Sequence, residues 1–102
     1  MPIHLMNAKH SPENCPINNE KAKKMYEEFM GHIDDLAKKY GVKILGSWTS
    51  MNEHLMVMVY EGSYQALEKL TMEPAIIKMV AMQDTCEIKT VTTMEESMKM
   101  LK

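Results

Sequence analysis

The chain of 102 residues predicts an α+β fold whose main elements follow the order β-α-β-β-α-β. Two patterns carry this prediction. Apolar residues repeat at helical spacing between positions 18 and 40, and they alternate with other residues in short segments before and after that stretch. Apolar residues make up 45% of the chain and charged residues 25%, which is typical of an ordinary globular domain. We therefore expect residues 1–102 to form one domain.

The first 41 residues predict a strand, a loop and a long helix. Residues 2–9 alternate as a strand, and the two prolines within residues 10–16 favour a stiff, non-helical loop. Asn18 or Asn19 is a suitable N-cap for a helix that runs to Tyr40, and Gly41 ends that helix. One stripe of this helix is apolar and aromatic, and we expect it to face the core: Ala22, Tyr26, Phe29, Ile33, Leu36, Ala37 and Tyr40.

The second half of the chain predicts a hairpin, a broken helix, a fourth strand and a short terminal helix. Residues 42–50 and 53–61 form the two strands of the hairpin, because the turn near Met51 is too short for another connection. Ser63 is a suitable N-cap for the next helix, and Pro74 begins a second helical piece that ends near residue 82. Residues 85–92 form the fourth strand, and Thr93 with Glu96 forms a capping box at the start of the terminal helix.

The strand at residues 53–61 is apolar on both of its faces. His54, Met56, Met58 and Tyr60 point to one side, and Leu55, Val57 and Val59 point to the other. Helices of the same chain can cover only one face of the sheet. A second copy packed sheet against sheet is the simplest cover for the other face, so we expect an isologous homodimer.

This element order is the ferredoxin-like arrangement, with helices on one face of a four-stranded antiparallel sheet. At this point the chain resembles the dimeric α/β-barrel superfamily, which includes small antibiotic-biosynthesis-type monooxygenases, muconolactone isomerase-like proteins and many uncharacterised stand-alone domains. The resemblance covers nearly the whole chain and rests on topology, on the strand His54-Leu55-Met56-Val57-Met58-Val59-Tyr60 and on the helix through Glu73-Pro74. It implies a dimer whose protomers each hold a small pocket between helices and sheet. It carries over no catalytic residue.

Charge and cysteine content exclude several partners. All 12 basic residues are lysines spread along a chain of pI near 6.1, so no basic stripe is present to bind nucleic acid. No apolar run approaches the length of a membrane span, and the N-terminus lacks the pattern of an export signal. We expect a cytoplasmic protein without nucleic-acid or membrane partners, in which Cys15 and Cys86 are reduced thiols.

Strand direction brings soft-ligand side chains to one edge of the predicted sheet. If the first and second strands run upward and the third and fourth run downward, the top edge collects His10, Cys15, Trp48, His54 and Cys86. Imidazole nitrogen and thiolate sulfur suit zinc, copper(I) or iron. His10, Cys15 and His54 are the candidate metal ligands, and Cys86 is an optional fourth. The structural alternative is that these residues only pack in the core or end a loop.

The same residues allow chemistry without a metal. Cys15 precedes a helix N-terminus, whose field favours a thiolate, and His10 or His54 could accept its proton, which makes Cys15 a candidate nucleophile. His54 is also a candidate general base, while Trp48 and Tyr60 could line a pocket for a flat ligand.

Three functions therefore stay open at this point. The first is a binding protein for a small ligand or a soft metal. The second is a cofactor-independent monooxygenase or isomerase of the kind that the resemblance implies. The third is a structural or regulatory dimerisation module whose pocket has no function. Each would use the same predicted fold.

Overall fold

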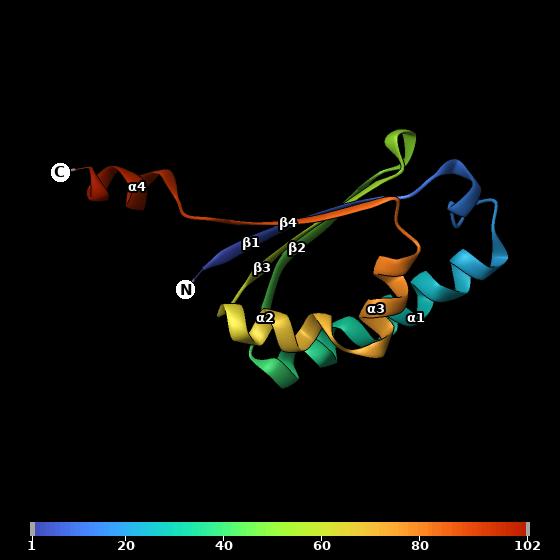
Figure 1. Ribbon diagram of the computed structural model, residues 1–102, viewed down its shortest axis with the longest axis horizontal. Coiled ribbons are helices and arrows are strands. Elements are labelled where there is room, and N and C mark those ends of the chain that lie inside the picture. Colours follow the sequence, from blue (N-terminus) through green and yellow to red (C-terminus); the bar gives the residue numbers. More distant parts are fainter. Residues whose placement is uncertain (1, 102) are drawn as a thin grey trace.

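The structure, a computed structural model, describes residues 2–101 and has the predicted α+β ferredoxin-like fold. A four-stranded antiparallel sheet has the strand order β2-β3-β1-β4, and α1, α2 and α3 lie on one of its faces (Figure 1). The elements in chain order are β1 (Ile3–Lys9), η1 (Pro12–Asn14), α1 (Glu20–Tyr40), β2 (Lys43–Ser50), η2 (Met51–Glu53), β3 (Leu55–Glu61), α2 (Tyr64–Thr71), α3 (Pro74–Ala81), β4 (Thr85–Val91) and α4 (Met94–Met100).

The predicted signals at the ends of α1 are confirmed. The side chain of Asn19 accepts a hydrogen bond from the backbone N–H of Ala22 at 3.0 Å, as an N-cap does. Gly41 adopts φ 73°, the left-handed conformation that ends a helix and that glycine adopts without strain. The loop before the helix differs from the prediction in one respect. Its prolines permit a single 3-10 turn at Pro12–Asn14, because proline is tolerated in the first turn of a helix.

The helix-facing side of the sheet carries the core. Met6, Met58 and Tyr60 point from the central strands toward Phe29 and Ile33 of α1, and all five are at least 96% buried. Burial of these large side chains against α1 is the main source of stability in a domain of this size.

The opposite side of the sheet has no covering element among the described residues, and we call it the open face. On the two central strands it presents Leu5, Val57 and Val59, which are partly exposed. Since Met56, Met58 and Tyr60 point the other way, the predicted two-sided apolar character of β3 is confirmed.

A bulge in β2 decides which side chains reach the open face. The register between β2 and β3 shifts between Ile44 and Gly46, so β2 holds one extra residue. One extra residue reverses the facing of every residue that follows it. Trp48 consequently lies on the open face, opposite Val57, with its indole ring over Gly46, where a Cβ atom would come within 2.3 Å of the ring.

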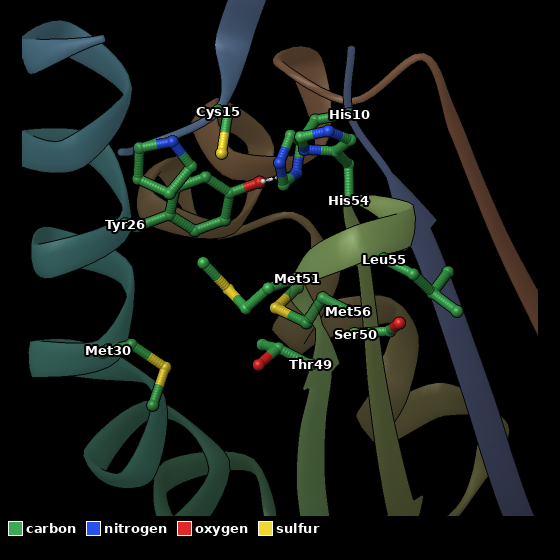
Figure 2. Close-up of a pocket in the computed structure, with 11 residues that line it drawn as sticks. His10, Cys15, Tyr26, Met30, Thr49, Ser50, Met51, His54, Leu55 and Met56 are labelled. Carbon is green, nitrogen blue, oxygen red and sulfur yellow. Dashed lines mark hydrogen bonds between the residues drawn. The ribbon is translucent and has the colours of Figure 1, made fainter. Parts of the chain in front are cut away.

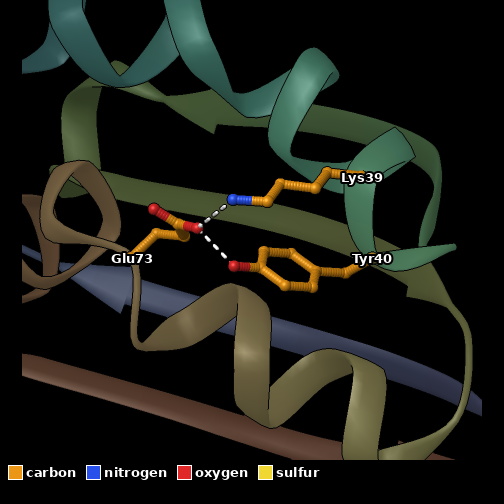
Figure 3. A network of polar contacts seen from close by, with 3 residues as sticks. All are labelled: Lys39, Tyr40 and Glu73. Atoms are coloured by element: carbon orange, nitrogen blue, oxygen red, sulfur yellow. Dashed lines mark hydrogen bonds and ion pairs between the residues drawn. The ribbon is translucent and has the colours of Figure 1, made fainter.

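The junction between α2 and α3 is tied to the end of α1. Glu73 is the N-cap residue of α3, yet its carboxylate makes no capping hydrogen bond. It accepts a hydrogen bond from the hydroxyl of Tyr40 and pairs with Lys39 at 3.4 Å (Figure 3). The predicted break at Pro74 is thus held in place by contacts to a third helix.

The C-terminal segment extends away from the rest of the molecule. The chain leaves the sheet after β4, and α4 lies beyond it, far from α1, α2 and α3 (Figure 1). The hydroxyl of Thr93 accepts from the N–H of Glu96, as in the predicted capping box. Among residues 2–101, every helix is too short or too polar to span a lipid bilayer.

Candidate functional site

Two connections meet at the end of the sheet where β1 stops and β3 starts. The backbone N–H of His10 donates to the carbonyl of His54 at 3.1 Å, which joins the loop after β1 to the hairpin between β2 and β3. His54 ends the η2 turn with φ 54°, a left-handed conformation that is uncommon for a residue other than glycine. Strained backbone of this kind persists where surrounding contacts fix it, and it is frequent at functional sites.

Cys15 joins the two histidines from the proline-bearing loop. Its backbone N–H donates to Pro12, and its carbonyl accepts from Asn18 and Asn19, so the loop folds its thiol inward. Cys15 is 3% exposed. One ligand atom from each of His10, Cys15 and His54 lies within 4.8 Å of the other two, and Figure 2 shows the thiol beside the two rings. We call these three residues the His/Cys cluster.

Each histidine of the cluster keeps a buried ring nitrogen free. Among the described residues, His10 Nε2 and His54 Nδ1 are buried and have no hydrogen-bond partner. The rings are 5.3 Å apart between centroids with an interplanar angle of 69°. A buried polar atom without a partner costs free energy, so two such atoms beside a thiol mark the cluster as a candidate binding site.

The outer nitrogen of His10 is held by a short chain of hydrogen bonds. His10 Nδ1 lies 3.2 Å from the hydroxyl of Tyr26, and Gln83 Nε2 donates to that same hydroxyl at 2.6 Å. The Tyr26 oxygen can therefore accept from both neighbours, which leaves the inner nitrogen of His10 with its lone pair directed into the cluster.

Electrostatics favour the neutral form of His10. Burial lowers the pKa of His10 most, the neighbouring His54 lowers it further, and Asp84 partly offsets both. Neutral imidazole is the form that binds a metal ion or accepts a proton. Burial also raises the pKa of the Tyr26 hydroxyl, so Tyr26 keeps its proton near neutral pH.

The cluster stands at one side of an apolar pocket of about 280 Å³ between α1 and the sheet. Figure 2 shows thioether side chains from α1, the hairpin and β3 around this space. None of the residues that line it carries a carboxylate or an ammonium group: His10, Cys15, Pro16, Tyr26, Met30, Thr49, Ser50, Met51, His54, Leu55 and Met56. The pocket suits a small, predominantly apolar ligand.

Cys86 does not join the cluster. It pairs with Ala8 at the start of the edge strand β4, and it lines a separate apolar groove with Ile77, Val80 and Ala81 of α3. Burial there raises the pKa of the Cys86 thiol. Strand β1 separates β4 from β3, so Cys86 shares an end of the sheet with the histidines without sharing their site.

Trp48 and Tyr60 lie on opposite faces of the sheet and do not line a common pocket. Trp48 is 59% exposed on the open face. Tyr60 is 4% exposed in the core, where its hydroxyl donates to the thioether of Met58 at 3.2 Å and burial raises its pKa. The bulge in β2 is the physical reason, because without it Trp48 would have faced the helices.

Several residues of the site were not predicted from the sequence. Tyr26 was expected only as a core residue of α1, and Gln83 carried no signal at all. Met30, one turn along α1 from Tyr26, does have a signal, because residues four apart share a helix face. The position of Gln83 beside the Tyr26 hydroxyl depends on the turn after α3, and sequence spacing does not specify the shape of that turn.

Comparison with known proteins finds solved structures that share this fold. No family model matches the chain, and no curated protein matches its sequence. A solved structural-genomics protein from Agrobacterium tumefaciens is 14% identical with a TM-score of 0.61, covering 90% of this chain and 92% of its own. A solved antibiotic biosynthesis monooxygenase is 12% identical with a TM-score of 0.62, covering 91% and 98%. A protein from Arabidopsis thaliana is 12% identical with a TM-score of 0.53, covering 91% and 95%.

The chain shares its α+β ferredoxin-like fold with these solved proteins. The resemblance inferred from the order of elements and from the strand around Val57 is thereby confirmed at the level of the fold. Identities this low carry no residue role from those proteins to this one. The function must be argued from the His/Cys cluster and its pocket.

Proposed function

We propose that the protein is a small homodimeric binding protein whose His/Cys cluster binds a soft transition metal ion beside a pocket for a small ligand. The observation that carries this proposal is the pair of buried, unpartnered imidazole nitrogens next to the buried thiol of Cys15. Two imidazoles and one thiolate are ligands typical of zinc, copper and iron. Binding a metal would satisfy both nitrogens at once.

The chain would supply three ligands to a metal ion, all from residues that also line the pocket. A site with three protein ligands and one open position is typical of metal centres that bind a further molecule. Tyr26 supports the ligand role of His10, since ligating histidines usually donate their other N–H to a fixed acceptor. Gln83 in turn fixes the Tyr26 hydroxyl.

Metal analysis of matched variants tests this proposal. Purified protein, prepared with and without oxygen and offered Zn(II) or Cu(I), is expected to retain about one equivalent of at least one of these metals by elemental analysis after gel filtration. Cys15→Ser combined with His10→Gln should remove binding, because two of three ligands are lost. Cys86→Ser is the matched control and should bind as the unchanged protein does. Absence of bound metal under all these conditions, or equal loss in the Cys86→Ser control, contradicts the proposal.

A cofactor-independent monooxygenase or isomerase is the second candidate. The apolar pocket that His54 lines favours it, because a general base must lie beside its substrate. Metal-free protein would then turn over a small apolar compound with an acidic proton. His54→Gln should abolish that turnover, whereas Cys15→Ser should leave it unchanged. If Cys15→Ser instead abolishes the turnover, the metal site is favoured over the metal-free enzyme.

The open face supports a homodimer in both cases. Leu5, Val57 and Val59 present an apolar surface on the side of the sheet away from the helices. An apolar surface of this kind is typical of a contact with another protein. If the protein binds neither a metal nor a substrate, the apolar open face still supports the third possibility, a dimerisation module.

A further inference from the structure

The charge balance of the His/Cys cluster distinguishes between the metals that it could bind. Thiolate from Cys15 contributes one negative charge, and the two histidines are neutral ligands. A divalent zinc ion in this site therefore leaves one net positive charge, whereas copper(I) leaves none. Transfer of a net charge into apolar surroundings is costly. The surroundings of the cluster therefore decide whether it binds zinc or copper(I) more tightly.

Those surroundings offer little to stabilise a positive charge. The lining of the pocket contains no carboxylate, and its polar side chains beyond the cluster are Tyr26, Thr49 and Ser50. Asp84 is the acid that acts on His10, but its effect on that ring is smaller than the effects of burial and of His54. A hydroxide on zinc could restore neutrality only if polar groups solvated it, and beyond the cluster the pocket lining offers only the hydroxyl groups of Tyr26, Thr49 and Ser50 for this.

The same pocket is rich in soft sulfur. Met30, Met51 and Met56 bring three thioethers from three different elements to one small space (Figure 2). Soft sulfur ligands such as the thiolate of Cys15 favour copper(I), and the thioethers surround the cluster's pocket with soft, uncharged groups, while hard oxygen ligands favour magnesium, calcium or manganese. Copper(I) is also stable with three ligands, which matches the number of donors in the cluster.

We propose that the His/Cys cluster is a copper(I) site that discriminates against zinc by leaving no net charge in an apolar pocket. This inference rests on the proposed function, since it names the metal of that same site. It implies that a negative charge added to the pocket lining should restore zinc binding and change copper(I) binding little. Thr49 is the position for this change, because it lines the pocket and is itself exposed, so a carboxylate there is tolerated by the fold.

The experiment compares the unchanged protein with Thr49→Asp and with the uncharged control Thr49→Asn. Each is titrated without oxygen with Cu(I) and separately with Zn(II), in competition with a chromophoric chelator for that metal. We expect the unchanged protein and Thr49→Asn to take one Cu(I) and to bind Zn(II) weakly. Thr49→Asp should bind Zn(II) at least tenfold more tightly than Thr49→Asn does, while its affinity for Cu(I) stays within about threefold.

The outcomes separate this inference from the proposed function. If both metals bind and Thr49→Asp changes neither affinity, or changes both equally, the charge argument is wrong while the metal site stands. If zinc binds the unchanged protein in preference to copper(I), the inference is also overturned. If neither metal binds any of the three proteins, the proposed function fails together with it. Circular dichroism of the three proteins establishes that each is folded.

Discussion

At the scale of single residues, His4 shows how this small core accommodates a polar side chain. Its ring is completely buried on the helix-facing side of β1. His4 Nε2 lies 2.9 Å from the carbonyl oxygen of Gly62, which can only accept, so Nε2 carries the proton. The other ring nitrogen, Nδ1, lies 2.9 Å from the hydroxyl oxygen of Thr90, which can donate to it. Both nitrogens are satisfied, unlike those of His10 and His54.

Removing the hydroxyl of Thr90 should therefore destabilise the protein. Thr90→Val leaves His4 Nδ1 buried without its donor, and we expect the free energy of unfolding to fall by about 1–2 kcal/mol. Thr85→Val on the same strand is the control, because Thr85 faces away from His4, and its effect should stay within about 0.5 kcal/mol. Urea denaturation followed by circular dichroism measures both values. Equal stability of the two variants would mean that the contact contributes nothing.

At the scale of elements, Glu73 connects three helices. Its carboxylate accepts from Tyr40 at the end of α1 while its backbone caps α3 just after α2. The hydrogen bond from Tyr40 lowers the pKa of Glu73 most, burial opposes it as the next largest effect, and the hydrogen bond and charge of Lys39 lower the pKa further. In the unfolded chain this carboxyl group has its ordinary pKa. The ionised form is therefore stabilised by folding.

This shift predicts a pH dependence of stability. A carboxyl group with a lowered pKa stabilises the fold above its ordinary value near 4.5, and that contribution is lost as the pH falls through the lowered pKa. Tyr40→Phe should lower the melting temperature at pH 7, and its difference from the unchanged protein should shrink as the solution is acidified below pH 4.5. Lys39→Gln should have a smaller effect, because Lys39 is exposed. A pH-independent difference for Tyr40→Phe would exclude the proposed cause.

Element patterns also explain how much of the site could be predicted. Strand directions alone predicted that His10, Cys15 and His54 would share an end of the sheet, because β1, β3 and the loop before α1 are fixed by spacing and by capping residues. Spacing does not predict a bulge, and the extra residue in β2 places the side chain of Trp48 on the other face of the sheet. Spacing also places Cys86 at the right end of the sheet without revealing that it lines a different groove, together with residues of α3.

At the scale of the whole molecule, the chain is thin and elongated, with extents of 52 × 30 × 17 Å. One layer of helices covers one face of the sheet, and β4 carries α4 well beyond it (Figure 1). A chain of about 100 residues buries a smaller share of its surface than a larger domain does, so covering the open face would add stability. Helix α4 is exposed as well, with Met94 and Leu101 both nearly 80% exposed.

The open face should therefore close by self-association, and Val59 is the position at which to test this. Val59 lies opposite Leu5 in the centre of that face, so Val59→Lys places an ammonium group in the contact between two copies. Sedimentation equilibrium should give twice the chain mass of 11.8 kDa for the unchanged protein and a single chain mass for Val59→Lys. Met72→Lys, 71% exposed at the end of α2, is the control and should remain dimeric.

Metal binding by the Val59→Lys monomer then indicates whether the two properties are separable. The His/Cys cluster and its pocket are built entirely from one chain, on the helix-facing side of the sheet. A monomer that keeps its helical circular dichroism should therefore still bind one metal ion. A dimeric Val59→Lys protein, or an unchanged protein that sediments as a monomer at tens of micromolar, would show that the apolar open face is not the surface through which two copies meet.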